Sequence, residues 1–150
     1  MDTTKLGAVS GTIGAIASII PGLLEKNILK LAKLTFLDYA SVLTVGHQAT
    51  DIWHWLIAAI GHITFGAAMG IAFAFFIKKT NNESLIFKGC GYGALLWLVT
   101  LGIGTLFKMR HFTVVDPSDC FFILVDAVVY GLITSVAYRL LTKKREIPWR

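Results

Sequence analysis

Two ionisable side chains lie inside long apolar stretches of the sequence. His62 lies within residues 52–77, and Asp126 lies within residues 120–141. If both stretches start at the same membrane surface, His62 lies roughly 15 Å deep and Asp126 roughly 12 Å deep, at about 1.5 Å per helical residue. The two side chains could therefore meet, and Tyr130, one helical turn beyond Asp126, could join them. Such an intramembrane group can relay a proton or bind an ion.

Further histidines precede His62 at a regular spacing. On one continuous helix, His47, Asp51, His54 and His62 would fall within a narrow arc at about 100° per residue. Imidazole and carboxylate groups on one face are typical ligands of a divalent metal such as Zn²⁺, and they can also relay protons. We therefore predict that His47, Asp51 and His54 line an outer ion or metal vestibule above His62.

Structural roles compete with these chemical ones, and we favour the structural roles. His47 and His54 could be hydrated residues at the membrane surface, and His62 with Asp126 could be a buried pair that fixes the register of two helices. Ion or proton handling ranks second, and metal-dependent chemistry ranks third. The sequence has no HExxH, serine-nucleophile or CxxC motif, so we predict no enzyme activity and no cofactor.

The elements that carry these residues are predicted to be membrane-spanning helices. The chain has 150 residues, of which 55% are hydrophobic and 15% are charged. A soluble domain is roughly 25% charged, so this composition argues against a soluble globule and against a disordered chain. Crossing a bilayer takes about 20 helical residues. We therefore predict an all-α integral membrane bundle with four spans, at about 6–24, 52–77, 85–107 and 120–141.

Residues 25–50 fit neither a clean span nor an ordinary loop. Lys26, Lys30 and Lys33 recur at helical spacing. Beside them runs an apolar stripe that consists of Leu29, Ala32, Phe36, Ala40 and Leu43. This pattern predicts an extra amphipathic helix that lies at the outer interface, or a re-entrant segment packed on the bundle. A fifth crossing over residues 34–45 is the less favoured alternative, because the run is short and contains Asp38.

The fourth span begins with signals that are typical of a helix start. Asp116 precedes Pro117, and Asp119 lies in the first turn. An aspartate is a favoured N-cap, proline is favoured at the first helical position, and a carboxylate suits the first turn. We therefore assign structural roles to Asp116 and Asp119.

Small residues recur four positions apart in all four predicted spans. The pairs are Gly7/Gly11, Gly66/Gly70, Gly89/Gly93 and Gly131/Ser135. This spacing lets helix backbones approach closely, and we expect it to serve packing within the bundle rather than dimerisation. Because the first and third spans open on similar glycine patterns, and the second and fourth share an aromatic–glycine pair, we predict two helical hairpins of the same orientation that form a pseudo-repeat.

The basic residues predict the orientation in the membrane. Of the 14 Lys and Arg, nine lie at or near the surface that bears both termini, and the other five lie on the opposite side. This bias places both termini in the cytoplasm. The net charge of +5 is spread between apolar runs, which suits a membrane topology and argues against nucleic acid as a partner. The expected partners are membrane lipids and another membrane protein or a second copy of the chain.

The second half of the chain resembles a known group of proteins. Phe87–Trp97 and Val129–Gly131 are similar to small multi-pass membrane proteins of Gram-positive bacteria, the YqhR-like group. The resemblance implies a bacterial cytoplasmic membrane protein and assigns no functional residues. Together these observations predict a structural or regulatory membrane protein that acts through helix–helix contacts. The alternative is a small transporter or channel for protons or ions that uses His62 and Asp126.

Overall fold

The structure, a computed structural model, describes residues 2–81, 83–109, 112 and 115–143, and within them it contains helices and no strand. The helices are α1 (Thr3–Leu23), α2 (Phe36–Val45), α3 (Ile52–Thr80), α4 (Leu85–Leu106) and α5 (Pro117–Lys143), and a π-helical turn, η1 (Leu24–Ile28), continues α1. The predicted all-α class, with a short extra helix between the first two spans, is confirmed.

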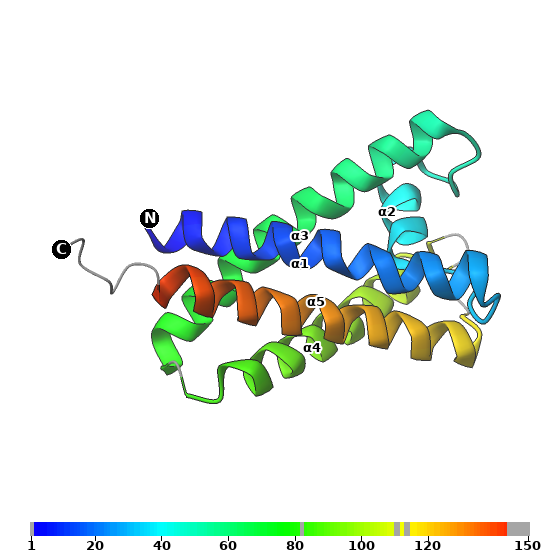
Figure 1. Cartoon of the computed structure of the whole chain (residues 1–150). Coiled ribbons are helices and arrows are strands. Elements are labelled where there is room, and N and C mark those ends of the chain that lie inside the picture. The colour runs from blue at the N-terminus through cyan, green and yellow to red at the C-terminus, as the bar shows by residue number, and fades with distance from the viewer. Residues whose placement is uncertain (1, 82, 110–111, 113–114, 144–150) are drawn as a thin grey trace.

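Four of these helices are long and apolar enough to cross a membrane: α1 with η1, α3, α4 and α5. A helix satisfies all of its backbone hydrogen bonds internally, as the hydrocarbon region of a bilayer requires. Their ends lie within a few residues of the predicted bounds. In Figure 1, α1 begins and α5 ends at one end of the bundle, which we call the terminal end, and α2 lies at the other, the α2 end.

The long helices follow the spatial order α3–α1–α5–α4. Helix α1 packs closely against α3 and α5, and α5 packs closely against α1 and α4. Helices α3 and α4 are consecutive in the sequence, yet they touch each other only slightly. The ring of four helices is therefore closed on the α1–α5 side and open on the α3–α4 side.

Glycines form the close contacts within each of the two hairpins. In the α1–α3 hairpin Gly7 faces Gly70, and Gly11 faces Gly66 and Gly70; in the α4–α5 hairpin Gly89 faces Gly131 and Ser135, and Gly93 faces Ala127. A Cβ atom at any of these glycines would collide with the facing helix. The contacts run in the same order in both hairpins, so α1 corresponds to α4 and α3 corresponds to α5, as the pseudo-repeat requires.

Large apolar side chains gather towards the two ends of the bundle. Phe73 and Ile77 belong to a buried cluster near the terminal end. Tyr39, Phe112 and Ile123 belong to a second cluster at the α2 end. Between these clusters, small and polar side chains line the interior. The buried polar residues there include Ser18, Asp126 and Thr134. Small residues allow close packing of helices in a membrane, where apolar burial gives little driving force.

The segment between the first two spans differs from the predicted amphipathic helix. Residues 29–35 are not helical, so Lys26, Lys30 and Lys33 share no helical face. The predicted apolar stripe is also wrong, because Ala32 and Ala40 are buried whereas Leu29 and Leu43 are more than half exposed. A new helix starts instead at Phe36, where Thr35 and Asp38 form a reciprocal capping box.

Helix α2 packs against the bundle. This agrees with the predicted possibility of a segment packed on the bundle. All residues from Leu37 to Val42 are buried, and the helix has only 10 residues. A helix of this length rises about 15 Å, which is half of the roughly 30 Å that a crossing needs. A fifth crossing is therefore wrong, and α2 instead fills part of the space between α3 and α4.

Candidate functional site

Asp126 lies in the middle of α5 and faces α1. Its side chain is almost fully buried, and its Oδ1 atom has no hydrogen-bond partner. Gly22 of α1 makes room for the carboxyl group, since a Cβ atom at that glycine would lie 2.8 Å from Asp126 Oδ2. A buried carboxyl group with an unsatisfied oxygen is costly.

Glu25 is a second buried acid beside Asp126. It lies in η1, three residues after Gly22, and therefore on the face of α1 that meets α5. Its Oε2 atom is also buried without a hydrogen-bond partner, and the two carboxyl groups are close enough to interact electrostatically. The sequence analysis missed Glu25 by assigning it to the start of the amphipathic segment. Its helical spacing from Gly22 is the signal that would have found it.

His62 of α3 bonds to α1 rather than to Asp126. Its Nε2 atom lies 3.1 Å from the carbonyl oxygen of Ala15 and 3.3 Å from the hydroxyl oxygen of Ser18. A carbonyl oxygen only accepts hydrogen bonds, so Nε2 of the neutral imidazole carries the proton. The Nδ1 atom is then an acceptor, and it has no partner among the described residues.

The predicted group of His62, Asp126 and Tyr130 is brought together only in part. His62 and Asp126 line one narrow cavity of about 10 Å³, together with residues of α1 and of the segment before α2. This volume is at the lower limit for one water molecule. Tyr130 bonds elsewhere, because its hydroxyl group donates to the carbonyl oxygen of Gly66 at 2.8 Å. The sequence therefore placed His62 and Asp126 at the same depth, but the charged group that acts electrostatically on Asp126 is Glu25.

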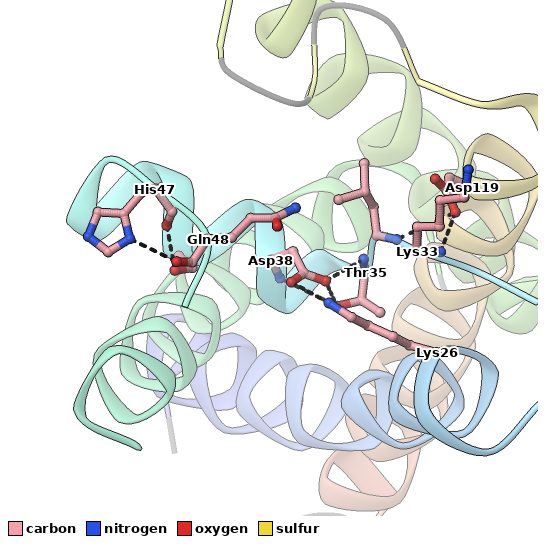
Figure 2. A network of polar contacts seen from close by, with 9 residues as sticks. Lys26, Lys33, Thr35, Asp38, His47, Gln48 and Asp119 are labelled. Atoms are coloured by element: carbon pink, nitrogen blue, oxygen red, sulfur yellow. Dashed lines mark hydrogen bonds and ion pairs between the residues drawn. The ribbon is translucent and has the colours of Figure 1, made fainter. Parts of the chain in front are cut away.

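Two other buried acids, Asp38 and Asp119, have hydrogen-bond partners (Figure 2). Asp38 pairs with the ammonium group of Lys26 at 2.6 Å and accepts the backbone N–H of Thr35 at 2.9 Å. Asp119 accepts the backbone N–H of Lys33 at 2.7 Å. These contacts tie the chain before α2 to η1 and α5, so both acids have a structural role. For Asp119 this role is a contact with a distant segment, whereas the sequence predicted a role in the first turn of its own helix.

Asp116 stabilises the same connection at its exposed edge. Its carboxylate lies 2.7 Å from the ammonium group of Lys33. This hydrogen bond, with the charge of Asp116, raises the pKa of Lys33 above its usual value. Because both side chains are mostly exposed, the pair is worth little to the stability of the fold.

His47, Asp51 and His54 meet at the surface of the α2 end. The rings of His47 and His54 lie 4.7 Å apart, and His54 Nδ1 lies 3.1 Å from a carboxylate oxygen of Asp51. Asp51 is also the N-cap of α3, and the backbone N–H of His54 lowers the pKa of its carboxyl group. Since α2 ends at Val45 and α3 begins at Ile52, the predicted single helix through these residues and His62 is wrong.

No metal centre forms from these residues. Within the part of the chain that the structure describes, no three His, Cys, Asp or Glu side chains are arranged to hold a metal ion. His62 lies eight residues further along α3 than His54, about 12 Å away along the helix. The surface histidines and the buried acids are therefore separate features, and the buried acids form the candidate site.

Comparisons of the chain with protein-family models, with curated proteins and with solved structures found no match. The resemblance of its second half to the YqhR-like group stays a prediction. The candidate site is therefore argued from its own geometry alone.

Proposed function

We propose that this chain is a small multi-pass protein of a bacterial cytoplasmic membrane, which binds and passes protons at the buried pair of Glu25 and Asp126. The observation that carries this proposal is the pair of carboxyl oxygens, Glu25 Oε2 and Asp126 Oδ1, which are buried without hydrogen-bond partners. Ionisable groups inside membrane spans are costly and commonly mark proton or ion pathways. A proton on the pair removes negative charge and supplies an O–H donor.

The structural alternative for Asp126 is weakened by its partners, because a register-fixing acid needs strong ones and the favourable contact of this carboxyl group is with the backbone N–H of Gly22. Asp38 has Lys26, and Asp119 has backbone N–H groups. Among the described residues no basic side chain pairs with Asp126, and the charged group that acts on it is another acid, Glu25. Two acids that interact electrostatically repel each other when both are ionised. This arrangement favours an exchangeable proton over a permanent ion pair.

Helix–helix association with a partner, the other predicted function, draws little support from the glycines. Gly7, Gly11, Gly66 and Gly70 are all used in contacts within the chain, and so are Gly89, Gly93 and Gly131. They are therefore not available as a docking stripe for a second protein. A structural or regulatory role stays a prediction. The absence of proton flux in the measurement described below would favour it.

The distribution of basic residues supports an orientation with both termini in the cytoplasm. Lys144, Arg145 and Arg150, which contribute to this bias, lie outside the described residues. In this orientation the acid pair lies in the half of the membrane nearer the outer surface, close to the α2 end.

Proton flux into liposomes tests the proposal. The purified protein is reconstituted around a pH-sensitive dye, and a potassium diffusion potential drives proton movement. We expect a flux above that of protein-free liposomes, and at least about a tenfold loss in Asp126→Asn, since one missing relay group interrupts proton transfer. Asp51→Asn is the matched control, because asparagine also caps a helix. A flux that is unchanged in Asp126→Asn, or equal to that of empty liposomes, contradicts the proposal.

A hydrophobic carbodiimide separates a bound proton from a bound cation. This reagent modifies protonated carboxyl groups in apolar surroundings, and peptide mass spectrometry locates the label. We expect label on Asp126 or Glu25 and none on Asp38, whose carboxylate is paired. Added Na⁺ or K⁺ should leave the labelling unchanged. Protection by either cation would replace the proton with that ion and overturn the proposal as stated.

A further inference from the structure

The open side of the bundle contains a cleft between α3 and α4. Its volume is about 290 Å³, and its apolar lining includes Phe36, Leu43, Phe65 and Ile103. An apolar cavity of about 150 Å³ already holds benzene, so this cleft has room for part of a hydrocarbon chain. Two hydrogen bonds join α4 to its neighbours on this side: the Tyr39 hydroxyl group of α2 donates to the carbonyl oxygen of Thr100, and the Tyr92 hydroxyl group donates to that of Met69 in α3.

The cleft opens towards the hydrocarbon region of the membrane. Helices α3 and α4 are both candidate spans, and the side chains of Leu43, Phe65 and Ile103 are each more than a third exposed at its mouth. Lipid chains are the molecules that meet such a surface in a bilayer. The occupant is therefore expected to enter sideways and to carry at least one flexible apolar chain.

Two polar atoms in the cleft have no partner. Thr100 is 94% buried, as its relative exposure of 6% shows, and its hydroxyl group has no hydrogen-bond partner among the described residues. Nδ1 of His62, which lines the same cleft, is the second. The other hydroxyl groups of the lining already donate: Thr44 to Ala40, and Tyr39 to Thr100. Burial raises the pKa of Tyr39, so its hydroxyl group remains a donor.

The two free atoms define the headgroup that would fit. The imidazole Nδ1 accepts a hydrogen bond, and the Thr100 hydroxyl group can donate one. Among the described residues no Lys or Arg lines the cleft, so a phosphate or an ionised carboxylate finds no counter-charge from them. An ester has no donor for Nδ1. A neutral hydroxyl group donates to His62 and accepts from Thr100, and so satisfies both.

We propose that the cleft between α3 and α4 binds a single-chain lipid alcohol, with its hydroxyl group between His62 and Thr100 and its chain along Phe65 and Ile103. His62 separates this cleft from the narrow cavity of Asp126, since it lines both. The alcohol site thus goes beyond the proposed proton function. Its test measures binding without any flux, so either proposal can fail alone.

Photolabelling in nanodiscs tests the alcohol site. The probe is dodecanol with a diazirine on its chain, and the competitors are dodecanol, dodecyl methyl ether and dodecane. We expect label on peptides of α3 and α4 beside the cleft. Dodecanol should compete about fivefold better than the methyl ether, which matches the loss of one hydrogen bond, and the alkane should be the weakest competitor.

Two variants address the headgroup and two address the chain. Thr100→Val keeps the side-chain shape and should reduce the advantage of dodecanol over dodecane about fivefold. His62→Phe should bring dodecanol down to the level of the methyl ether. Ile103→Trp fills the cleft and should abolish labelling, whereas Leu98→Trp, at an exposed position of the same helix outside the lining, should not.

Three results would overturn the inference. Label spread evenly over the lipid-facing helices would mean that no site exists. Equal competition by dodecanol and dodecane in the wild type would mean that the headgroup is not recognised. An unchanged ratio of dodecanol to dodecane in both Thr100→Val and His62→Phe would show that these two side chains do not bind the hydroxyl group.

Discussion

The two sides of the helix bundle differ, although the pseudo-repeat would make them equivalent. If α1 corresponds to α4 and α3 to α5, the α1–α5 interface corresponds to the α4–α3 side. The first is tightly packed, and the second is open. Phe36, Tyr39 and Leu43 of the extra segment lie in the opening. The two sides therefore differ where α2 packs, and residues of α2 line the cleft on the α3–α4 side.

The buried acids of the extra segment and those of the closed α1–α5 interface differ in their hydrogen-bond partners. Asp38 and Asp119, which hold the extra segment in place, accept hydrogen bonds from Lys26, Thr35 and the backbone of Lys33. Glu25 and Asp126, at the closed α1–α5 interface, each have an oxygen without a partner. In a structural acid the carboxylate oxygens have hydrogen-bond partners, whereas in a candidate proton-exchange site an oxygen lacks one. The comparison therefore separates acids that hold the fold from acids that could carry a proton.

Filling the closed interface should have the largest effect. A Cβ atom at Gly14 would lie 2.9 Å from the Tyr130 carbonyl oxygen and closer still to the Thr134 hydroxyl group. We expect Gly14→Leu to reduce the free energy of unfolding by about 3 kcal/mol or to prevent folding. Gly102→Leu is the matched control, since Gly102 has open space around it. Unfolding in mixed micelles measures both, and equal stability of the two variants would contradict the packing contrast.

Removing a satisfied acid should cost more than altering an unsatisfied one. Asp38→Ala leaves Lys26 without its partner and breaks the capping box of α2, so we expect a loss of about 2 kcal/mol. Asp126→Asn keeps the shape of the side chain and should change the stability by less than about 1 kcal/mol. Thermal unfolding of both variants provides the measurement. The reverse order would mean that Asp126 is the structural acid.

Loosening the open side should have a smaller effect. The Tyr39 hydroxyl group donates to the Thr100 carbonyl oxygen at 2.7 Å and holds α2 against α4. Tyr39→Phe removes this bond, and we expect a loss of about 1 kcal/mol, with faster hydrogen exchange confined to α2 and the adjacent part of α4. Faster exchange throughout α1 and α5 instead would show that the two sides are not independent.

Acid should loosen the start of α3, with the smallest effect. The carboxylate of Asp51 accepts the backbone N–H groups of Trp53 and His54, and these bonds lower its pKa below the usual 3.8. Its contribution is therefore fully present above the usual pKa and is lost as the pH falls through the lowered value. Hydrogen exchange at residues 52–55 should rise in that range. In Asp51→Asn this dependence should vanish, and its persistence would assign the effect to another group.

The sequence predicted the spans and the glycine contacts because both signals are local. An apolar run and a four-residue spacing of glycines require knowledge of one helix at a time. The extra segment was predicted incorrectly because its conformation depends on distant partners. Lys26 pairs with Asp38 across a break in the helix, and the backbone of Lys33 bonds to Asp119, 86 residues away.

For the candidate site, the sequence predicted the depth of His62 and Asp126 in the membrane but not the residues that they contact. Counting residues from the membrane surface placed His62 and Asp126 at one level, where they share a cavity. The count gives no rotation of α3 about its axis, so it did not reveal that His62 bonds to Ala15 and Ser18. Glu25 was missed because a charged residue after an apolar run predicts the end of a span, whereas η1 turns it inward.

Infrared spectroscopy of the protonated carboxyl group tests the central claim most directly. In lipid at neutral pH, the account predicts a carbonyl stretch of a protonated carboxylic acid, which shifts when H₂O is exchanged for D₂O and is lost or displaced in Asp126→Asn. Asp51→Asn should leave the band unchanged. The absence of such a band in the wild type, or an identical band in Asp126→Asn and Glu25→Gln, would show that the buried pair holds no proton.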